Sequence, residues 1–158
     1  MTWLRLLWEL PQTALGAALS TLVWRKNKLD NMPVKEIKYL HGLEKITAKK
    51  IYIVKDGYLR SLSSFSLGKY VFIKFRCLHN TKTIRHECVG HSKQSAKYGW
   101  LYLPVVGLPS IARNIYGRFR VIDYYGGWPE NEADKLAGIV WADGKRVVMK
   151  PVITGKGE

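Results

Sequence analysis

The longest apolar stretch of the chain, residues 3–24, sets the first limit on how these 158 residues fold. A helix that crosses a bilayer needs about 20 nearly uninterrupted apolar residues. Glu9, Pro11 and Gln12 interrupt this stretch, and residues 14–24 alone are too short to cross. A cleaved signal peptide also fits poorly, because the start is weakly basic and the apolar part is broken. The sequence therefore favours a helix that lies on, or dips into, the surface of a bilayer.

Two environments remain open for this N-terminal helix. On a membrane, its tryptophans would lie at the level of the headgroups and the basic run would contact anionic lipid: Trp3, Trp8, Trp24, Arg25, Lys26 and Lys28. Alternatively, the helix is amphipathic and packs on the core of the protein. We expect the first arrangement, with residues 1–29 as a membrane-associating segment on the cytoplasmic face and residues 30–158 as the remaining domain.

Charge and composition narrow the class of protein further. Lys and Arg number 26 against 12 Asp and Glu, which gives a net charge of +14 and favours an anionic partner. The hydrophobic fraction of 47% is enough for a core and excludes an intrinsically disordered chain. Two cysteines are too few for the disulfide framework of a small secreted protein. With the N-terminal segment, these values favour an anionic membrane surface as the partner, and no nucleic acid is expected.

The pattern of the remaining chain predicts an α+β domain without internal repeats. Expected strands cover residues 50–54 and 68–75, with a turn at Asp56-Gly57 and a further short strand or loop at residues 59–67. Expected helices cover residues 83–98, which end at Gly99, and residues 129–136, which begin with a proline. Less regular parts are residues 34–46, a short helix or loop; 123–127, a turn; and the tail from residue 140, a short hairpin. Residues 100–112 are apolar but too broken by prolines for a spanning helix, and three assignments stay open for them: core, the wall of a substrate cleft, or a second segment that touches a membrane.

Chemistry is concentrated in the run His86-Glu87-Cys88-Val89-Gly90-His91. Two imidazoles on neighbouring helical turns, with a carboxylate just after the first, suit a catalytic zinc ion. The imidazoles would ligate the metal, and Glu87 would take a proton from the zinc-activated water and deliver it to the leaving group. Glu87 is also the only acidic side chain between Gly57 and Ile122, a stretch that holds eleven Lys and Arg. Such an isolated carboxylate indicates a role beyond solvation of a helix face.

A second acidic group lies downstream, in Glu130-Asn131-Glu132-Ala133-Asp134. Residues four apart share one face of a helix, so Glu130 and Asp134 would point in the same direction. Glu130 would complete a site of two histidines and one glutamate, which leaves a coordination position for water or substrate. Asp134 would accept a hydrogen bond from a ligating imidazole and thereby fix its tautomer.

These motifs resemble the gluzincin class of zinc metallopeptidases, in which a second helix supplies the glutamate ligand. The resemblance implies Zn²⁺ held by His86, His91 and Glu130, with Glu87 as the catalytic base and Asp134 behind the ligands. It also implies a zincin-like fold in which an edge strand, here residues 68–75, packs beside the metal-binding helix and binds a peptide or protein substrate in extended form. Small bacterial membrane-associated zincin-like proteins show a similar pattern, matched here by Gln94-Ser95, residues 99–102 and residues 107–110. The resemblance covers residues 68–138.

The spacing of the two histidines departs from the common zincin motif, in which they lie four residues apart. His86 and His91 lie five apart, which at about 100° per residue places them about 140° apart around a regular helix. One extra residue in a π-type bulge would bring both to the same ion, and Gly90 is the permissive place for it. The dipeptidyl peptidase III family is similar in this respect, because its His-Glu-x-x-Gly-His motif has the same spacing and the same glycine.

Other assignments of these residues stay open at the level of sequence. Cys and His within 15 residues are numerous enough for a closed structural zinc site, which would make the chain a basic, zinc-stabilised binding protein without catalysis: Cys77, His79, His86, Cys88 and His91. A zincin fold that has lost its activity and serves as a membrane scaffold is a third possibility. The group that stabilises the oxyanion is also open among five candidates: Arg113, Arg118, Arg120, Tyr124 and Tyr125.

Overall fold

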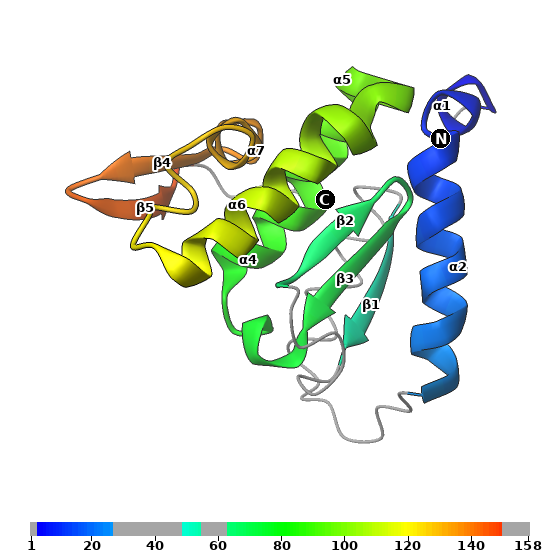
Figure 1. The fold of residues 1–158 in the computed structure, drawn as a ribbon, viewed down its shortest axis with the longest axis horizontal. Coiled ribbons are helices and arrows are strands. Elements are labelled where there is room, and N and C mark those ends of the chain that lie inside the picture. The colour runs from blue at the N-terminus through cyan, green and yellow to red at the C-terminus, as the bar shows by residue number, and fades with distance from the viewer. Residues whose placement is uncertain (1–2, 27–48, 55–62, 150–158) are drawn as a thin grey trace, which may run out of the picture.

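The computed structural model describes residues 3–26, 49–54 and 63–149 (Figure 1). The elements in chain order are α1 (Trp3–Trp8), α2 (Leu10–Lys26), β1 (Lys50–Val54), β2 (Phe65–Leu67), β3 (Tyr70–Lys74), the 3-10 turn η1 (Phe75–Cys77), α4 (Thr81–Arg85), the π-helical segment η2 (His86–His91), α5 (Ser92–Tyr98), the 3-10 turn η3 (Gly99–Leu101), the π-helical segment η4 (Leu103–Gly107), α6 (Leu108–Phe119), α7 (Glu130–Leu136), β4 (Ile139–Ala142) and β5 (Lys145–Val148). This mixture of helices and small sheets confirms the α+β class. The Asp56-Gly57 turn, residues 34–46 and the boundary after residue 29 lie outside the described residues.

The three-stranded sheet has the order β1-β3-β2, with β1 parallel to β3 and β2 antiparallel to it. The strand expected at the edge of the sheet is therefore its centre, and this expectation was wrong. Residues 71–74 of β3 are all buried, because the strand is covered on both faces, and a nearly continuous apolar run is typical of such a strand. The edge strand next to η2 is β2, which comes from the serine-rich segment.

Alternate residues of β3 serve two apolar clusters on opposite faces of the sheet. Val71 and Ile73 pack with Ile84 and Cys88 from the helix that carries the histidines. Phe72 packs in the second cluster, to which Leu19 of α2 contributes. The sheet is thus the middle layer between α2 and the histidine-bearing helix, and it holds that helix in place (Figure 1).

The N-terminal helix uses its interrupting polar residues to attach itself to the domain. The Gln12 amide donates to Ser95 Oγ at 3.2 Å and to the Gly99 carbonyl at 3.0 Å. Glu9 is completely buried and lies 3.1 Å from Arg5 Nε and 3.6 Å from Lys49 Nζ. One face of α2 therefore packs on the protein, as the second of the two environments requires, while contact of this segment with a membrane stays a prediction.

No helix among the described residues is long and apolar enough to cross a membrane. Among the side chains of α1 and α2 whose burial the structure describes, seven large apolar ones are nevertheless exposed: Trp3, Leu4, Leu7, Trp8, Leu10, Leu15 and Leu22.

The helix predicted at residues 83–98 begins slightly earlier and is divided into α4, η2 and α5. The Asn80 side chain caps it by accepting from the Thr83 amide at 3.1 Å, and Gly99, with φ of 53°, ends it as expected. Residues 100–112, which the sequence did not assign to a helix, form η4 and the start of α6 despite Pro104 and Pro109. Each proline is among the first two residues of its segment, and the backbone is already helical before both segments.

The C-terminal elements agree with the sequence prediction. α7 begins at Glu130 directly after Pro129, and β4 and β5 form a hairpin around Asp143-Gly144. Both lie against the histidine-bearing helix, since α7 contacts η2 and β5 contacts α4. The fold thus places Glu130 and Asp134 of α7 next to the segment from His86 to His91.

Candidate metal centre

The π-helical segment η2 begins at His86 and ends at His91, so the predicted bulge is confirmed. It absorbs the extra residue and places the two imidazoles edge to face, with their ring centroids 4.7 Å apart. The role of Gly90 differs from the prediction, because its φ is not among the positive values of this chain. A Cβ at this position would lie 2.3 Å from the carbonyl oxygen of Ala133 in α7. Glycine is therefore needed for the close approach of the two helices.

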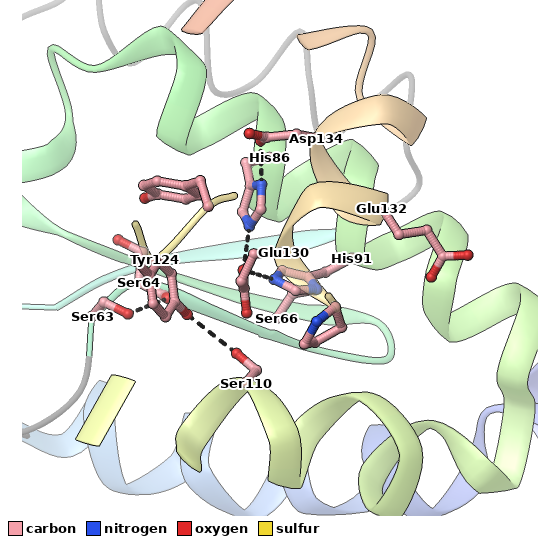
Figure 2. Close-up of polar contacts among 12 residues, drawn as sticks. Ser63, Ser64, Ser66, His86, His91, Ser110, Tyr124, Glu130, Glu132 and Asp134 are labelled. Atoms are coloured by element: carbon pink, nitrogen blue, oxygen red, sulfur yellow. Dashed lines mark hydrogen bonds and ion pairs between the residues drawn. The ribbon is translucent and has the colours of Figure 1, made fainter. Parts of the chain in front are cut away.

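Three side chains converge between η2 and α7, as Figure 2 shows: His86, His91 and Glu130. One ligand atom from each lies within 4.8 Å of the others, and all three residues are buried. Glu130 Oε2 is 2.9 Å from His86 Nε2 and 3.4 Å from His91 Nε2. The structure thus brings together the three ligands expected from the sequence.

Hydrogen bonds on the far side of each imidazole orient the two rings. His86 Nδ1 donates to Asp134 Oδ1 at 2.7 Å, as predicted, and His91 Nδ1 donates to Gln94 Oε1 at 2.8 Å. A neutral imidazole carries one proton, so a metal ion that displaced the Nε2–Glu130 contacts would find that proton held on Nδ1 and both Nε2 atoms free to bind it. That is the arrangement a metal ion requires of two histidine ligands.

Residues that the sequence did not single out as part of the site hold these orienting groups. Arg146 of β5 donates to Asp134 Oδ2 at 2.7 Å, and its guanidinium lies 3.4 Å from the centre of the Tyr125 ring, which in turn meets His86 edge-on. The Gln94 amide donates to the Pro129 carbonyl and to Glu132, each at 2.9 Å. Gln94 lies one turn after His91 on the same helix face, a spacing that could have indicated its role, whereas nothing in the sequence placed Arg146 here.

The pKa values of the ionisable side chains at the centre are shifted from their ordinary values. Burial alone would raise the pKa of Glu130, but hydrogen bonds from His86 and His91 hold it well below its ordinary value. Burial would lower the pKa of His86, but its contacts with Asp134 and Glu130 raise it. Asp134 likewise keeps a lowered pKa against its burial, because His86 and Arg146 both donate to it. Without a cation, a proton shared with His86 balances the two carboxylates.

Glu87 faces the same space from the first turn of η2. Its side chain is buried, Oε2 has no hydrogen-bond partner among the described residues, and burial raises its pKa to about 8 despite the nearby His91. Together with His91 it lines a cavity of about 480 Å³. A buried carboxyl oxygen without a hydrogen-bond partner is costly for stability, so its presence here points to a function.

The cavity runs from Glu87 outward between α2, β2 and α6, and its walls are mainly apolar. Tyr124 is one of the polar residues that line it, and its hydroxyl lies 3.2 Å from Ser110 Oγ (Figure 2). Of the other oxyanion candidates, Arg113 donates to the carbonyl oxygens of Asp123 and Tyr124 and thereby positions the loop, while Arg118 is exposed and bonded to Asn114. Tyr124 is the candidate that the structure brings to the cavity.

The residues present fit a divalent cation. Two imidazoles offer lone pairs to one point, and Glu130 is completely buried with Oε1 lacking a hydrogen-bond partner among the described residues. Two nitrogen ligands and one carboxylate are typical of a catalytic zinc site that keeps a position open. Glu87, Glu130 and Asp134, with Arg146 as the one basic partner, sum to a charge of −2 when ionised, which a divalent ion would neutralise.

The alternative ligand set built on cysteines does not assemble. Among the described residues, the only group of three or more potential ligands that converges is His86, His91 and Glu130. Cys88 instead belongs to the apolar cluster under the sheet, and Cys77 packs at its border. His79 likewise takes no part in the converging group. The structure therefore offers no support for a zinc-stabilised binding protein of the kind left open by the sequence.

No protein-family model, curated protein or solved structure matches this chain. The function is therefore inferred from the chemistry of the site, which is in any case a better guide to activity than a fold.

Proposed function

We propose that this protein is a zinc-dependent peptide hydrolase of the gluzincin type. The observation that carries the proposal is the buried convergence of His86, His91 and Glu130 beside Glu87, whose Oε2 has no hydrogen-bond partner among the described residues. An apolar cavity of about 480 Å³, which Glu87 and His91 line at its inner end, supplies room for a substrate. In this proposal His86, His91 and Glu130 hold the metal, which when bound acts as a Lewis acid that polarises a carbonyl and lowers the pKa of water.

The proposed role of Glu87 is that of general base and then general acid. It accepts a proton from the water that attacks the carbonyl carbon of the peptide and delivers it to the amide nitrogen as the C–N bond breaks. Its pKa of about 8 in the metal-free chain lies in the range where a carboxylate takes up and releases a proton efficiently. Its unpaired Oε2 is free of any hydrogen bond from the described residues that would compete for that proton.

Tyr124 is proposed to stabilise the negative charge that develops on the carbonyl oxygen. Burial raises the pKa of its hydroxyl, so the group stays protonated and can donate a hydrogen bond at neutral pH. The substrate itself is expected to lie extended along β2, since Ser64, Phe65 and Ser66 line the cavity and β2 has one edge unpaired among the described strands.

The test is metal analysis of the purified full-length chain, followed by hydrolysis of a peptide library. Wild-type protein should contain one zinc per chain and cleave peptides. Glu87→Gln should keep the metal and lose hydrolysis, while Glu130→Ala should lose most of the metal. Asp143→Asn, which alters an exposed carboxylate in the β4–β5 turn, is the matched control and should change neither.

Two results would overturn the proposal. A wild-type chain that takes up no zinc after incubation with the metal would remove the centre altogether. Release of zinc by Cys77→Ser or Cys88→Ser, with Glu130→Ala still loaded, would return the metal to the cysteine-based structural site.

A further inference from the structure

α6 presents an apolar stripe that the described residues do not cover. No residue of this helix is buried, although its apolar and polar residues are segregated to opposite sides. At about 100° per residue, four large side chains fall within an arc of about 80°: Leu108, Ile111, Ile115 and Phe119. All four are exposed, by 63%, 44%, 49% and 80% respectively. An amphipathic helix with its apolar side outward needs a partner for that side.

A second group of exposed apolar side chains lies in α1 and in η3, the 3-10 turn that precedes η4 and α6. The Trp100 indole of η3 donates to the Leu7 carbonyl of α1 at 2.6 Å, and the Trp8 indole of α1 donates to the Ala96 carbonyl at 2.9 Å. These bonds fix α1 beside η3, and the two segments together expose six large apolar side chains: Trp3, Leu4, Leu7, Trp8, Trp100 and Leu101. Figure 1 shows α1 close to the end of α5, which directly precedes η3. We call these six residues and the four of the α6 stripe the apolar face.

The mouth of the cavity opens in the apolar face. Leu108 and Ile111 are members of the face and also line the cavity, and Leu15 of α2, exposed by 44%, lines it from the other side. A route of apolar side chains thus leads from the surface to Glu87 and His91.

The charge around the apolar face indicates what covers it. The elements α1, η3, η4 and α6 contain no acidic side chain and three arginines, and the exposed Arg120 follows α6 directly. Arg118 lies beside the stripe on the helix surface and is also exposed. Tryptophans at one end, an apolar centre and flanking arginines are the composition of a helix that lies in the interface of an anionic bilayer.

We infer that the apolar face docks the protein on an anionic lipid bilayer, with the cavity opening at the lipid surface. The sequence predicted lipid contact for residues 3–24 and left it open for residues 100–112. The face uses α1 together with η3 and α6, and α2 supplies only one side of the cavity mouth. Docking does not require the metal, because no residue of the apolar face belongs to the metal centre. It deepens the proposed function by placing the substrate at the membrane surface, where an apolar polypeptide segment can enter the cavity directly.

The test is cosedimentation of the full-length chain with vesicles of phosphatidylcholine alone, or of equal parts phosphatidylcholine and phosphatidylglycerol. Wild-type protein should bind the anionic vesicles. Leu101→Asp and Ile115→Asp should each weaken binding about tenfold, because a carboxylate must enter the interface. The matched control is Met149→Asp at the end of the β4–β5 hairpin, exposed by 68% and outside the face, and it should bind like wild type.

Charge is tested by a separate variant. A double variant with Arg118→Gln and Arg120→Gln should bind anionic vesicles more weakly, by about fivefold for each arginine removed. Its affinity for neutral vesicles should change little. These altered side chains are all exposed, so the variants should fold like wild type. Circular dichroism and thermal unfolding check this for each variant.

Three outcomes would overturn the inference. Wild-type protein could stay in the supernatant with anionic vesicles, or Met149→Asp could lose as much binding as Ile115→Asp. A lipid-free dimer that Ile115→Asp dissociates would assign the face to a second copy of the chain. Glu130→Ala separates the two proposals, because it should lose zinc and still bind vesicles like wild type.

Discussion

Replacement of Gly90 by alanine tests the packing on which the metal centre depends. The added Cβ would lie 2.3 Å from the carbonyl oxygen of Ala133 and 2.9 Å from its carbonyl carbon. Both are backbone atoms of α7, so no side chain can rotate away. α7 must therefore move by roughly 1 Å to restore an ordinary contact, and Glu130 moves with it.

The cost follows from this overlap. Overpacking of a close helix contact destabilises a protein by about 1–3 kcal/mol, and alanine returns up to about 1 kcal/mol through its higher helix propensity. We expect a net loss of about 1–2 kcal/mol in the free energy of unfolding, which for a chain of this length is about 3–6 °C in Tm. The shift of Glu130 should weaken zinc binding about tenfold or more, because the ligand geometry is lost.

Gly107 provides a matched control, because it also lies in a π-helical segment. A Cβ there would meet Leu103 and Tyr102 at 3.7 and 3.8 Å, which are ordinary contacts. Gly107→Ala should therefore leave stability unchanged or raise it by up to about 1 kcal/mol. Thermal unfolding and competition with a zinc chelator measure both variants. Equal stability and equal zinc affinity of Gly90→Ala and Gly107→Ala would refute the reasoning.

Three further predictions follow from the site and its surroundings. Asp134→Asn should weaken zinc binding about tenfold to a hundredfold, measured by chelator competition, because the His86 ring loses its charged hydrogen-bond partner; unchanged affinity would show that Asp134 is not needed to orient the ring. Removal of zinc with a chelator should lower Tm, because a ligand that binds only the folded state stabilises it by about 2.7 kcal/mol at a hundred times its Kd. An unchanged Tm would show that the metal does not bind the folded state preferentially. Burial lowers the pKa of Lys49 from 10.5 to about 8, so the folded chain loses this proton before the unfolded chain does. The free energy of unfolding of wild type, measured by denaturant titration, should therefore rise relative to Lys49→Met by up to about 3 kcal/mol between pH 8 and 10.5. Parallel profiles of the two proteins would contradict a lowered pKa of Lys49.

Much of the site could be predicted because it depends on residues close together in the chain. The five-residue spacing of His86 and His91 is incompatible with a regular helix, so a π bulge followed from geometry alone. Glu130 and Asp134 share a helix face, which placed one at the ligand position and the other behind it. These inferences needed only the helical period and the chemistry of zinc ligands.

What sequence reasoning missed depends on contacts between distant segments. The position of β3 at the centre of the sheet is decided by its pairing with both β1 and β2, and a strand of five residues does not reveal its neighbours. The role of Gly90 depends on how closely α7 approaches, which local backbone preference does not report. Arg146 reaches Asp134 only because the hairpin folds back over α7. In each case the deciding partner is tertiary rather than local.

The attachment of α2 to the sheet has a consequence for any shortened form of the chain. Leu15 and Leu19 line the same hollow as Glu87 and His91, and Gln12 is tied to the helix on which His91 sits. Trimming the N-terminus past Leu19 would therefore remove one wall of the proposed substrate cavity and loosen the support of His91, a proposed metal ligand. Engineering of this protein should begin from its other end.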